Sequence, residues 1–178
     1  MIGIQEIDIN ILNYIQENIR NPLLDKIMPF INSFGNMALL WIIIGMVLFS
    51  IKKHRKYGYM VFLALLLCFL IGNLALKPLV ARIRPFDAYP LINGLLINAP
   101  KDFSFPSGHT MCSFAPSVVL FHFNKKIGVC ALVISVLIAL SRLYLYVHYP
   151  SDVLCGMIIG VINGIIAINV INKFYHKM

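Results

Sequence analysis

The stretch IGVCALVISVLIALSRLYLYV, residues 127–147, decides the fold class of this chain. Arg142 is its only charged residue. The stretch is long enough for an α-helix to cross the hydrocarbon core of a bilayer, which takes roughly 20 residues. Four further apolar stretches lie at about 27–51, 58–76, 103–123 and 151–172. We therefore predict an all-α, polytopic membrane helical bundle with five transmembrane helices.

The composition excludes an ordinary soluble domain. Hydrophobic residues make up 60% of the 178 residues and charged residues only 12%, and the mean hydropathy is +0.83. Soluble domains carry about 25% charged residues. Five spans would use about 100 residues and leave only short loops. We therefore expect one membrane-embedded domain over 1–178, with its functional site built from the bundle and its loops.

The segment 4–20 predicts a different kind of helix. Isoleucines recur in it at steps of three or four residues, and polar side chains fill the other positions. This spacing is typical of an amphipathic helix whose apolar stripe dips into the membrane interface without crossing it. The isoleucines of this stripe are Ile4, Ile7, Ile11, Ile15 and Ile19.

The basic residues predict the orientation of the bundle. Eight of the fifteen lysines and arginines, and none of the seven acidic residues, fall in the connections and the tail that one end of the predicted bundle shares. Because cytoplasmic loops are enriched in lysine and arginine, this end is predicted to be cytoplasmic. The loop 85–102 then lies on the extracytoplasmic side of the cell membrane, and nucleic-acid binding loses its support. The eight are Lys52, Lys53, Arg55, Lys56, Lys125, Lys126, Lys173 and Lys177.

Two other features bear on partners and cofactors. Gly156, Gly160 and Gly164 recur every four residues in the last span, a pattern that allows close helix packing, either within the chain or across a homodimer seam. The four cysteines stand singly in apolar stretches, without the close-spaced Cys or His pairs of a zinc site. We expect no metal ion and no cofactor.

Several charges gather where the second span meets the outer face. Lys77 and Arg84 are seven residues apart, which on a helix places them about two turns apart on one face. Pro78 disfavours helical geometry at Lys77, and Pro85 closes the segment. Both cations could converge on one anion. The alternative is a pair of anchors that snorkel to the interface.

The segment Ser104-Phe105-Pro106-Ser107-Gly108-His109 stands directly before the third apolar run. Proline suits the first turn of a helix, so Ser104 or a neighbour is predicted to cap it. The amides of Ser107 and Gly108 would then form an anion site at the positive end of the helix, and His109 could transfer a proton. A capped helix with an interfacial histidine is the alternative.

A third polar group joins the last two spans. Pro150 separates two helices, so that His148 ends one and Asp152 begins the next. A carboxylate bonded to one imidazole nitrogen raises the basicity of the other, as a histidine nucleophile requires. Arg142 adds a planar fork suited to phosphate oxygens. Alternatively, the His–Asp pair only ties two helices together.

Together these residues resemble the type 2 phosphatidic acid phosphatase family, integral-membrane lipid phosphatases that share a fold with vanadium haloperoxidases. Its three motifs fall here in the family's order and spacing, between Lys77 and Asp152. Many members have six spans, whereas this chain is predicted to have five and an interfacial helix. The matching residues are Lys77, Arg84, Pro85, Pro106, Ser107, Gly108, His109, Ser141, Arg142, His148 and Asp152.

The resemblance implies a metal-independent phosphatase that works through a phosphohistidine. By analogy, His148 attacks phosphorus, Asp152 orients it, and His109 protonates the leaving oxygen and later activates water. The phosphate-binding residues would be Lys77, Arg84, Ser107, Gly108 and Arg142. Two further cations on this side, Arg82 and Lys101, could serve a second phosphate or be solvated.

The predicted substrate is a lipid phosphate or diphosphate on the extracytoplasmic side. Undecaprenyl diphosphate is favoured, and phosphatidylglycerophosphate and phosphatidic acid are alternatives. A hypothesis of another class is a non-catalytic protein that binds or transports lipid phosphates. Binding alone would explain the cations, but it would not explain His148 beside Asp152 or His109 opposite them.

Overall fold

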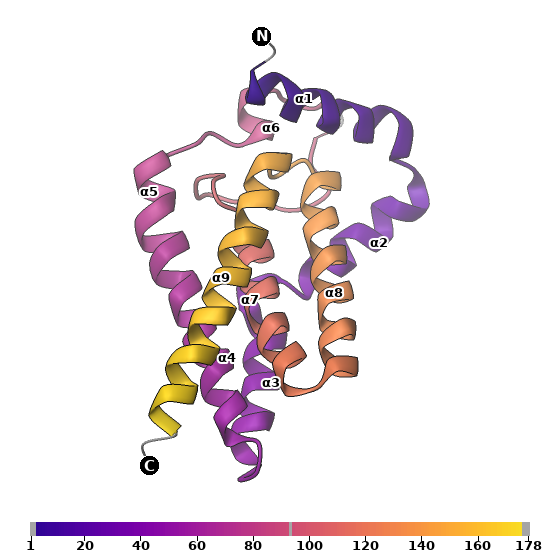
Figure 1. Ribbon diagram of the computed structural model, residues 1–178. Helices are drawn as coiled ribbons and strands as arrows, with labels where there is room; N and C mark the ends of the chain where they lie inside the picture. Colours follow the sequence, from indigo (N-terminus) through magenta and orange to yellow (C-terminus); the bar gives the residue numbers. More distant parts are fainter. Residues whose placement is uncertain (1–2, 93, 176–178) are drawn as a thin grey trace.

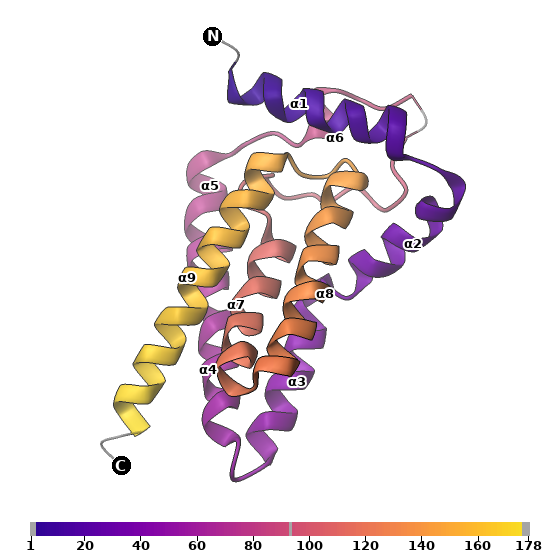
Figure 2. The ribbon, with the colours of Figure 1, turned by 45° about the vertical axis from the view of Figure 1, so that its right-hand side comes forward.

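The computed structural model describes residues 3–92 and 94–175, and within these ranges every regular element is helical. The long helices run side by side, and α7 lies in the middle of the bundle, packed against α4, α8 and α9 (Figures 1 and 2). The α-helices are α1 (Ile4–Tyr14), α2 (Pro22–Ser33), α3 (Leu39–Ser50), α4 (Arg55–Cys68), α5 (Lys77–Val80), α6 (Pro85–Ala88), α7 (Gly108–Phe123), α8 (Lys125–Tyr144) and α9 (Pro150–Tyr175).

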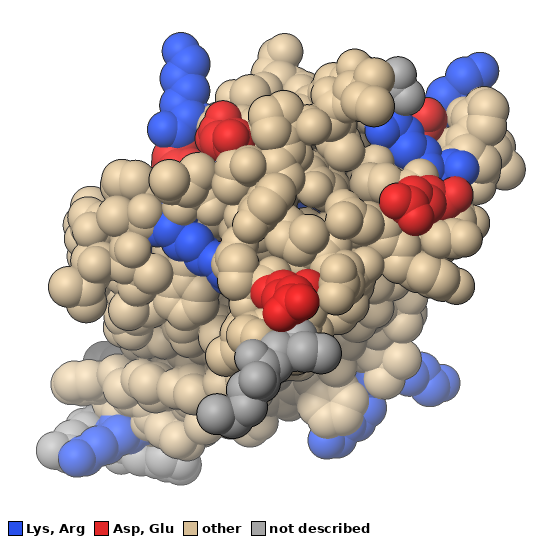
Figure 3. Space-filling model, turned by 90° about the horizontal axis from the view of Figure 1, so that it is seen from above, with Lys and Arg blue, Asp and Glu red and all other residues tan. Residues whose placement is uncertain are grey.

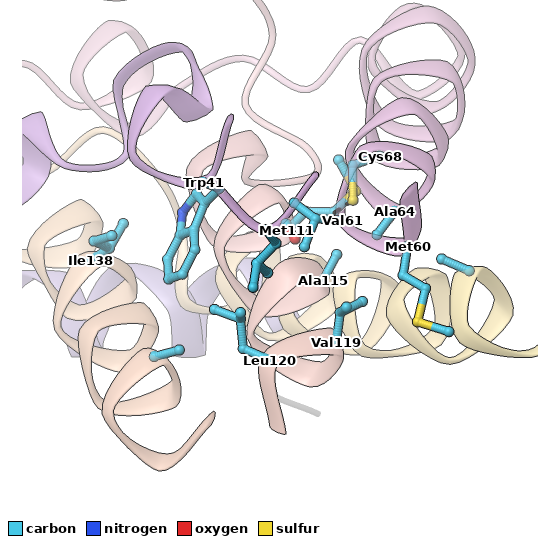
Figure 4. Packing of buried hydrophobic residues seen from close by; sticks show 13 residues of the cluster. Trp41, Met60, Val61, Ala64, Cys68, Met111, Ala115, Val119, Leu120 and Ile138 are labelled. Carbon is cyan, nitrogen blue, oxygen red and sulfur yellow. Dashed lines mark hydrogen bonds between the residues drawn. The ribbon is translucent and has the colours of Figure 1, made fainter. Parts of the chain in front are cut away.

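The apolar core lies where α3, α4 and α7 meet. Trp41 is its largest buried side chain, and it donates a hydrogen bond from Nε1 to Ser113 Oγ over 3.2 Å. Met60, Met111 and Leu120 pack into the same cluster (Figure 4). Apolar side chains also cover the outside of the long helices, as expected where lipid is the solvent.

The predicted span 27–51 is not one continuous helix in the structure. Residues 22–50 form α2 and α3, which are bent by 42° at the break between them. Met37 and Ala38 adopt left-handed backbone angles there, with φ of 52° and 55°. The break falls in the polar sequence Asn32-Ser33-Phe34-Gly35-Asn36, and both asparagines reach the functional cavity described below.

Fewer than five candidate membrane spans are found among the described residues. Within the described residues, three helical stretches are long and apolar enough to span a membrane, and α2 with α3 make a fourth if the bent pair is one span. The predicted span 103–123 is helical only as α7, which has 16 residues. The three stretches are Arg55–Ala88, Lys125–Tyr144 and Pro150–Tyr175. The count of five is therefore not confirmed.

The second predicted span continues through Lys77, against the expectation drawn from Pro78. A π-helical segment, Phe69–Leu76, follows α4, and Lys77 keeps helical angles with φ −59° and ψ −53°. The wider π turns change the pairing of backbone groups, so a proline that lacks an N–H is tolerated just after them. The outcome is that the Lys77 side chain points into the bundle, where it is buried.

The N-terminal segment is helical, as α1 followed by the π-helical turn Ile15–Ile19. α1 lies across one end of the bundle, over the start of α9 (Figure 2). Asp8 and Leu12 face the protein and are buried, whereas Ile4, Ile7 and Ile11 are exposed. This exposed stripe is consistent with lipid contact, and the interfacial position of α1 stays a prediction.

The glycine face of α9 packs within the chain. A Cβ atom at Gly156 would lie 2.8 Å from the carbonyl oxygen of Ser107, and one at Gly160 would lie 2.6 Å from that of Met111. Gly164 is equally close to the backbone of α7, at Ala115. Because α7 covers this face, the predicted homodimer seam through the three glycines is not supported.

Charge divides between the two ends of the bundle. The α3–α4 and α7–α8 connections and the end of α9 lie together, opposite α1 (Figure 1). They carry seven of the eight basic residues assigned to the cytoplasmic end, and Lys177 lies outside the described residues. Seen from the α1 end, acidic and basic side chains lie on the surface together (Figure 3).

Candidate active site

A polar cavity of about 160 Å³ lies beneath α1, between the break after α2, α5, α7 and the α8–α9 turn. It gathers six of the eight predicted site residues. Asp152 and Ser107 do not line it, and both are fully buried beside it. The six are Lys77, Arg84, Gly108, His109, Arg142 and His148.

A tight turn after α8 points His148 into this cavity. Tyr146 adopts a left-handed conformation with φ 59°, which is uncommon for a bulky residue and reverses the chain in a few positions. The His148 Nε2 atom then lies 3.2 Å from Arg84 Nη1. Since arginine can only donate, Nε2 must present its lone pair, and the ring proton sits on Nδ1.

The carboxylate behind His148 is held by several partners. Asp152 Oδ2 lies 3.6 Å from His148 Nδ1, which is longer than a direct hydrogen bond. The same oxygen accepts hydrogen bonds from Ser104 Oγ at 2.5 Å and from the Tyr149 amide at 3.0 Å. Ser104 Oγ is also 3.5 Å from His148 Nδ1. Ser104 therefore bridges the pair and does not cap α7.

Arg82 is not simply solvated, which corrects one of the two expectations for this residue. Its Nη1 donates to Asp152 Oδ1 over 2.6 Å, and its Nη2 donates to Asp8 Oδ2 over 2.7 Å. The guanidinium also lies over the ring of Tyr149. Arg82 thus links the buried carboxylate of Asp152 to α1.

Two cavity cations share one carboxylate. Arg84 Nη2 donates to Asp102 Oδ1 over 2.7 Å, and Lys77 Nζ binds Asp102 Oδ2. Although partial burial alone would raise the pKa of Asp102, the hydrogen bonds and charges of Lys77 and Arg84 lower it to about 2. Asp102 is therefore ionised at neutral pH.

Arg142 is the third cavity cation and is almost fully buried. Its Nη1 binds Asn32 Oδ1, from the end of α2. Its Nε is one of two buried side-chain polar atoms of the described residues that have no hydrogen-bond partner. A buried donor of this kind calls for a ligand or another partner. Arg142 therefore has an N–H group, at Nε, that is free to donate a hydrogen bond to a ligand.

The start of α7 differs from the predicted anion nest. The Ser107 amide donates to the carbonyl oxygen of Asp152 over 3.1 Å, and its hydroxyl pairs with Thr110 Oγ1 at 2.9 Å. Ser107 is thus used to fasten α7 to α9. Gly108 is the first residue of α7 and lines the cavity, with Lys77 Nζ 3.7 Å from where a Cβ would stand.

His109 faces the cavity from the first turn of α7. Its Nε2 lies 3.0 Å from Asn36 Oδ1, in the broken segment after α2. His109 also lines the cavity together with His148, which lies in the turn between α8 and α9. Burial lowers the pKa of His109 well below its usual value, and the positive charges of Arg142, Lys77 and Arg84 lower it further.

Sequence reasoning missed four residues of this site and misassigned Ser104. The end of α2 supplies Asn32, the break after α2 supplies Asn36, and the loop before α7 supplies Asn98 and Asp102. A detectable signal existed only for Asp102, an acidic residue two positions before Ser104. The asparagines carried no such signal, because a neutral amide attracts little notice in an apolar stretch, as at Asn32 and Asn36, or in a loop, as at Asn98.

The surroundings of His148 set its protonation state. Burial lowers its pKa well below the usual value, and the positive charges of the three cavity cations lower it further. The imidazole is therefore neutral at neutral pH, and its Nε2 lone pair faces Arg84 Nη1. Within residues 3–92 and 94–175, no three His, Cys, Asp or Glu side chains group closely enough to hold a metal ion.

Comparisons with known proteins agree with this arrangement. The chain is 32% identical over 148 residues to undecaprenyl-diphosphatase BcrC of Bacillus subtilis, covering 81% of this chain and 73% of that protein. The solved structure of LpxE from Aquifex aeolicus superposes with a TM-score of 0.77 at 31% identity, covering 92% of this chain and 95% of that one. A transmembrane PAP2-type phosphatidylglycerolphosphate phosphatase from Bacillus subtilis gives 0.68 at 26% identity, covering 98% and 95%.

Fold, site and relatives together define a multi-pass membrane phosphatase. Residues 53–175 match the PAP2 superfamily, and the chain belongs to that family. The matched region contains all eight predicted site residues, whereas α1 and α2 lie outside it.

Proposed function

We propose that this protein is a metal-independent lipid phosphatase whose nucleophile is His148. The observation that carries the proposal is the position of His148, which lines a cavity together with three cations and has its Nε2 atom 3.2 Å from one of them, Arg84. Phosphoryl transfer needs an in-line nucleophile and strong stabilisation of charge on the equatorial oxygens. Lys77, Arg84 and Arg142 supply that charge.

In the first step, His148 Nε2 forms a bond to phosphorus while the bond to the leaving oxygen breaks. His109, protonated once the anionic phosphate lies among the cations, gives that proton to the leaving oxygen. In the second step, His109 takes a proton from water, the water oxygen bonds to phosphorus, and the N–P bond breaks. Asp152 and Ser104 hold the Nδ1 side of His148 and stabilise the positive charge that develops on the ring.

The substrate is proposed to be a lipid because an apolar groove adjoins the cavity. The groove has a volume of about 640 Å³ and lies between α3, α4 and α7, with Ile42, Phe62 and Phe69 among its walls. It shares four residues with the polar cavity, so an acyl or prenyl chain in the groove would place its phosphate among the cations. The shared residues are Lys77, Asp102, Gly108 and His109.

We propose undecaprenyl diphosphate as the lipid substrate. The relative from Bacillus subtilis named undecaprenyl-diphosphatase, which matches over 81% of this chain, supports this choice. Phosphatidylglycerophosphate is the second candidate, and the likeness to a phosphatidylglycerolphosphate phosphatase favours it. The site is proposed to face the extracytoplasmic side, because the basic connections lie at the other end of the bundle.

The test is turnover by purified protein in detergent with EDTA. Undecaprenyl diphosphate, phosphatidylglycerophosphate and phosphatidic acid are compared at equal surface concentration, with and without vanadate. We expect release of inorganic phosphate from the first at the highest kcat/KM, inhibition by vanadate, and a drop of at least about a thousandfold in His148→Ala, since a nucleophile is lost. Quenching with ³²P-labelled substrate should trap acid-labile label on protein that retains His148.

A matched control is His122→Ala, which makes the same substitution at an exposed histidine near the far end of α7. It should keep the wild-type rate. Full activity in His148→Ala would exclude the phosphohistidine mechanism, and complete loss of activity in EDTA that Mg²⁺ restores would exclude metal independence. A higher kcat/KM for another lipid of the panel would reassign the substrate.

A further inference from the structure

Every donor of Arg84 is already in use within the protein. A guanidinium has five N–H groups. Nε donates to the Asp102 carbonyl oxygen at 2.7 Å, and Nη1 faces the Val147 carbonyl oxygen at 2.6 Å and His148 Nε2 at 3.2 Å. Nη2 donates to Asp102 Oδ1 at 2.7 Å and to the Phe103 carbonyl oxygen at 3.3 Å. Arg84 can therefore bind a phosphate oxygen only if one of these partners leaves.

The Asp102 carboxylate is the partner that can leave most easily. Its side chain is 52% exposed, whereas that of Arg84 is 3% exposed. The carboxylate needs only a side-chain rotation to reach water, but the carbonyl oxygens of Val147 and Phe103 can move only with the backbone. Asp102 also holds Lys77, so a single rotation frees both cations.

A phosphate and the Asp102 carboxylate cannot share these donors. Both are anions, and like charges at contact distance in a partly buried site repel strongly. The other carboxylate nearby, that of Asp152, is outside the cavity and is paired with Arg82. Asp102 is therefore the acidic side chain of the cavity lining that competes with an incoming anion.

We propose that Asp102 is an internal competitor of the substrate phosphate: it occupies Lys77 and Arg84, and it must swing out before the phosphate binds. This inference rests on the proposed function, because it assigns these cations to the phosphate. It adds a residue that sets phosphate affinity and speeds product release, since the returning carboxylate takes the donors from the departing phosphate.

The proposal has a quantitative consequence. When only a fraction of the molecules has the cations free, the apparent Kd is the intrinsic Kd divided by that fraction. If Asp102 holds the cations for 90 to 99% of the time, removing its charge should tighten phosphate binding by about 10- to 100-fold. The same factor should apply to orthovanadate, because both ligands displace the same group.

The experiment measures binding of inorganic phosphate and of orthovanadate to the purified full chain in detergent by calorimetry. Asp102→Asn and Asp102→Ala remove the charge, and Asp102→Glu keeps it. The matched control is Asp87→Asn, which makes the same change in net charge at an exposed position of α6 in the same part of the chain. Thermal melts confirm that each variant is folded.

We expect both neutral variants to bind the two anions at least about tenfold more tightly, with Asp102→Glu and Asp87→Asn near the wild-type Kd. Unchanged or weaker binding in a folded neutral variant would overturn the proposal. So would unfolding of both neutral variants, because Asp102 would then be a fixed structural counter-ion. Lack of lipid turnover by the wild type would defeat the proposed function and leave this binding comparison intact.

Discussion

Ser104 decides how the buried carboxylate reaches the nucleophile. Its hydroxyl donates to Asp152 Oδ2 and lies within 3.5 Å of His148 Nδ1, while the direct contact between carboxylate and imidazole is 3.6 Å. Ser104 is fully buried and does not line the cavity. Its contribution therefore acts through the orientation of His148 and not through phosphate binding.

Ser104→Ala should lower kcat and leave KM nearly unchanged. The hydrogen bond that is lost goes to a buried charged group, and such bonds contribute about 1.5–3 kcal/mol. A loss of this size in the transition state corresponds to a fall in kcat of about 10- to 100-fold. Steady-state kinetics on the preferred lipid measure both constants. A changed KM at constant kcat would place Ser104 in substrate binding instead.

Among the elements, α1 has a role that its amphipathic pattern does not reveal. Asp8 is buried and accepts hydrogen bonds from Arg82 Nη2 and from the Ser151 amide, beside Asp152. The helix therefore holds both Arg82 and the start of α9. α1 lies outside the region that matches the family, residues 53–175, yet it contacts Arg82 and Ser151 within that region.

Asp8→Asn should destabilise the protein. Two charge-assisted contacts weaken at a buried position, so we expect a loss of about 2 kcal/mol in the free energy of unfolding. For a chain of this size, that corresponds to a melting temperature lower by roughly 4–8 °C. Glu6→Gln is the matched control, with the same charge change on the exposed side of α1. Equal melting temperatures for the two variants would contradict this role of Asp8.

For the molecule as a whole, the two ends of the bundle differ in what they carry. One end holds the cavity, α1 and the acidic residues, and the other holds the basic connections between α3 and α4 and between α7 and α8. Such an asymmetry orients the bundle in the membrane. The proposal that the active site faces the extracytoplasmic side of the membrane depends on this charge asymmetry.

Cysteine labelling of intact cells tests the orientation. Ile92 is fully exposed in the loop near the cavity end, and Lys125 is exposed at the opposite end. In a background where the exposed Cys130 is replaced by serine, an impermeant maleimide should label Ile92→Cys and not Lys125→Cys. Permeabilised cells should show labelling of both. The reverse pattern on intact cells would place the active site in the cytoplasm.

The sequence predicted the family, the helical class and half of the residues that line the cavity. Lys77, Arg84, His109, Arg142 and His148 were recognisable because charged or titratable residues inside apolar surroundings need a reason to be there. Their neighbours Asn32 and Asn36 were not, since a neutral amide within an apolar run gives a weak signal. The break that exposes them to the cavity could not be read from hydropathy.

What the sequence alone determined was a membrane bundle with a cluster of cations and two histidines, because hydropathy and motif spacing are local properties of the chain. Only the tertiary structure decided the partners of those charges. It placed Ser104 between His148 and Asp152, gave Asp102 to Lys77 and Arg84, and turned the glycine face of α9 onto α7. These contacts join residues far apart in the chain. Which donor pairs with which acceptor depends on the groups that the folded bundle brings together, so a local sequence pattern does not predict these contacts.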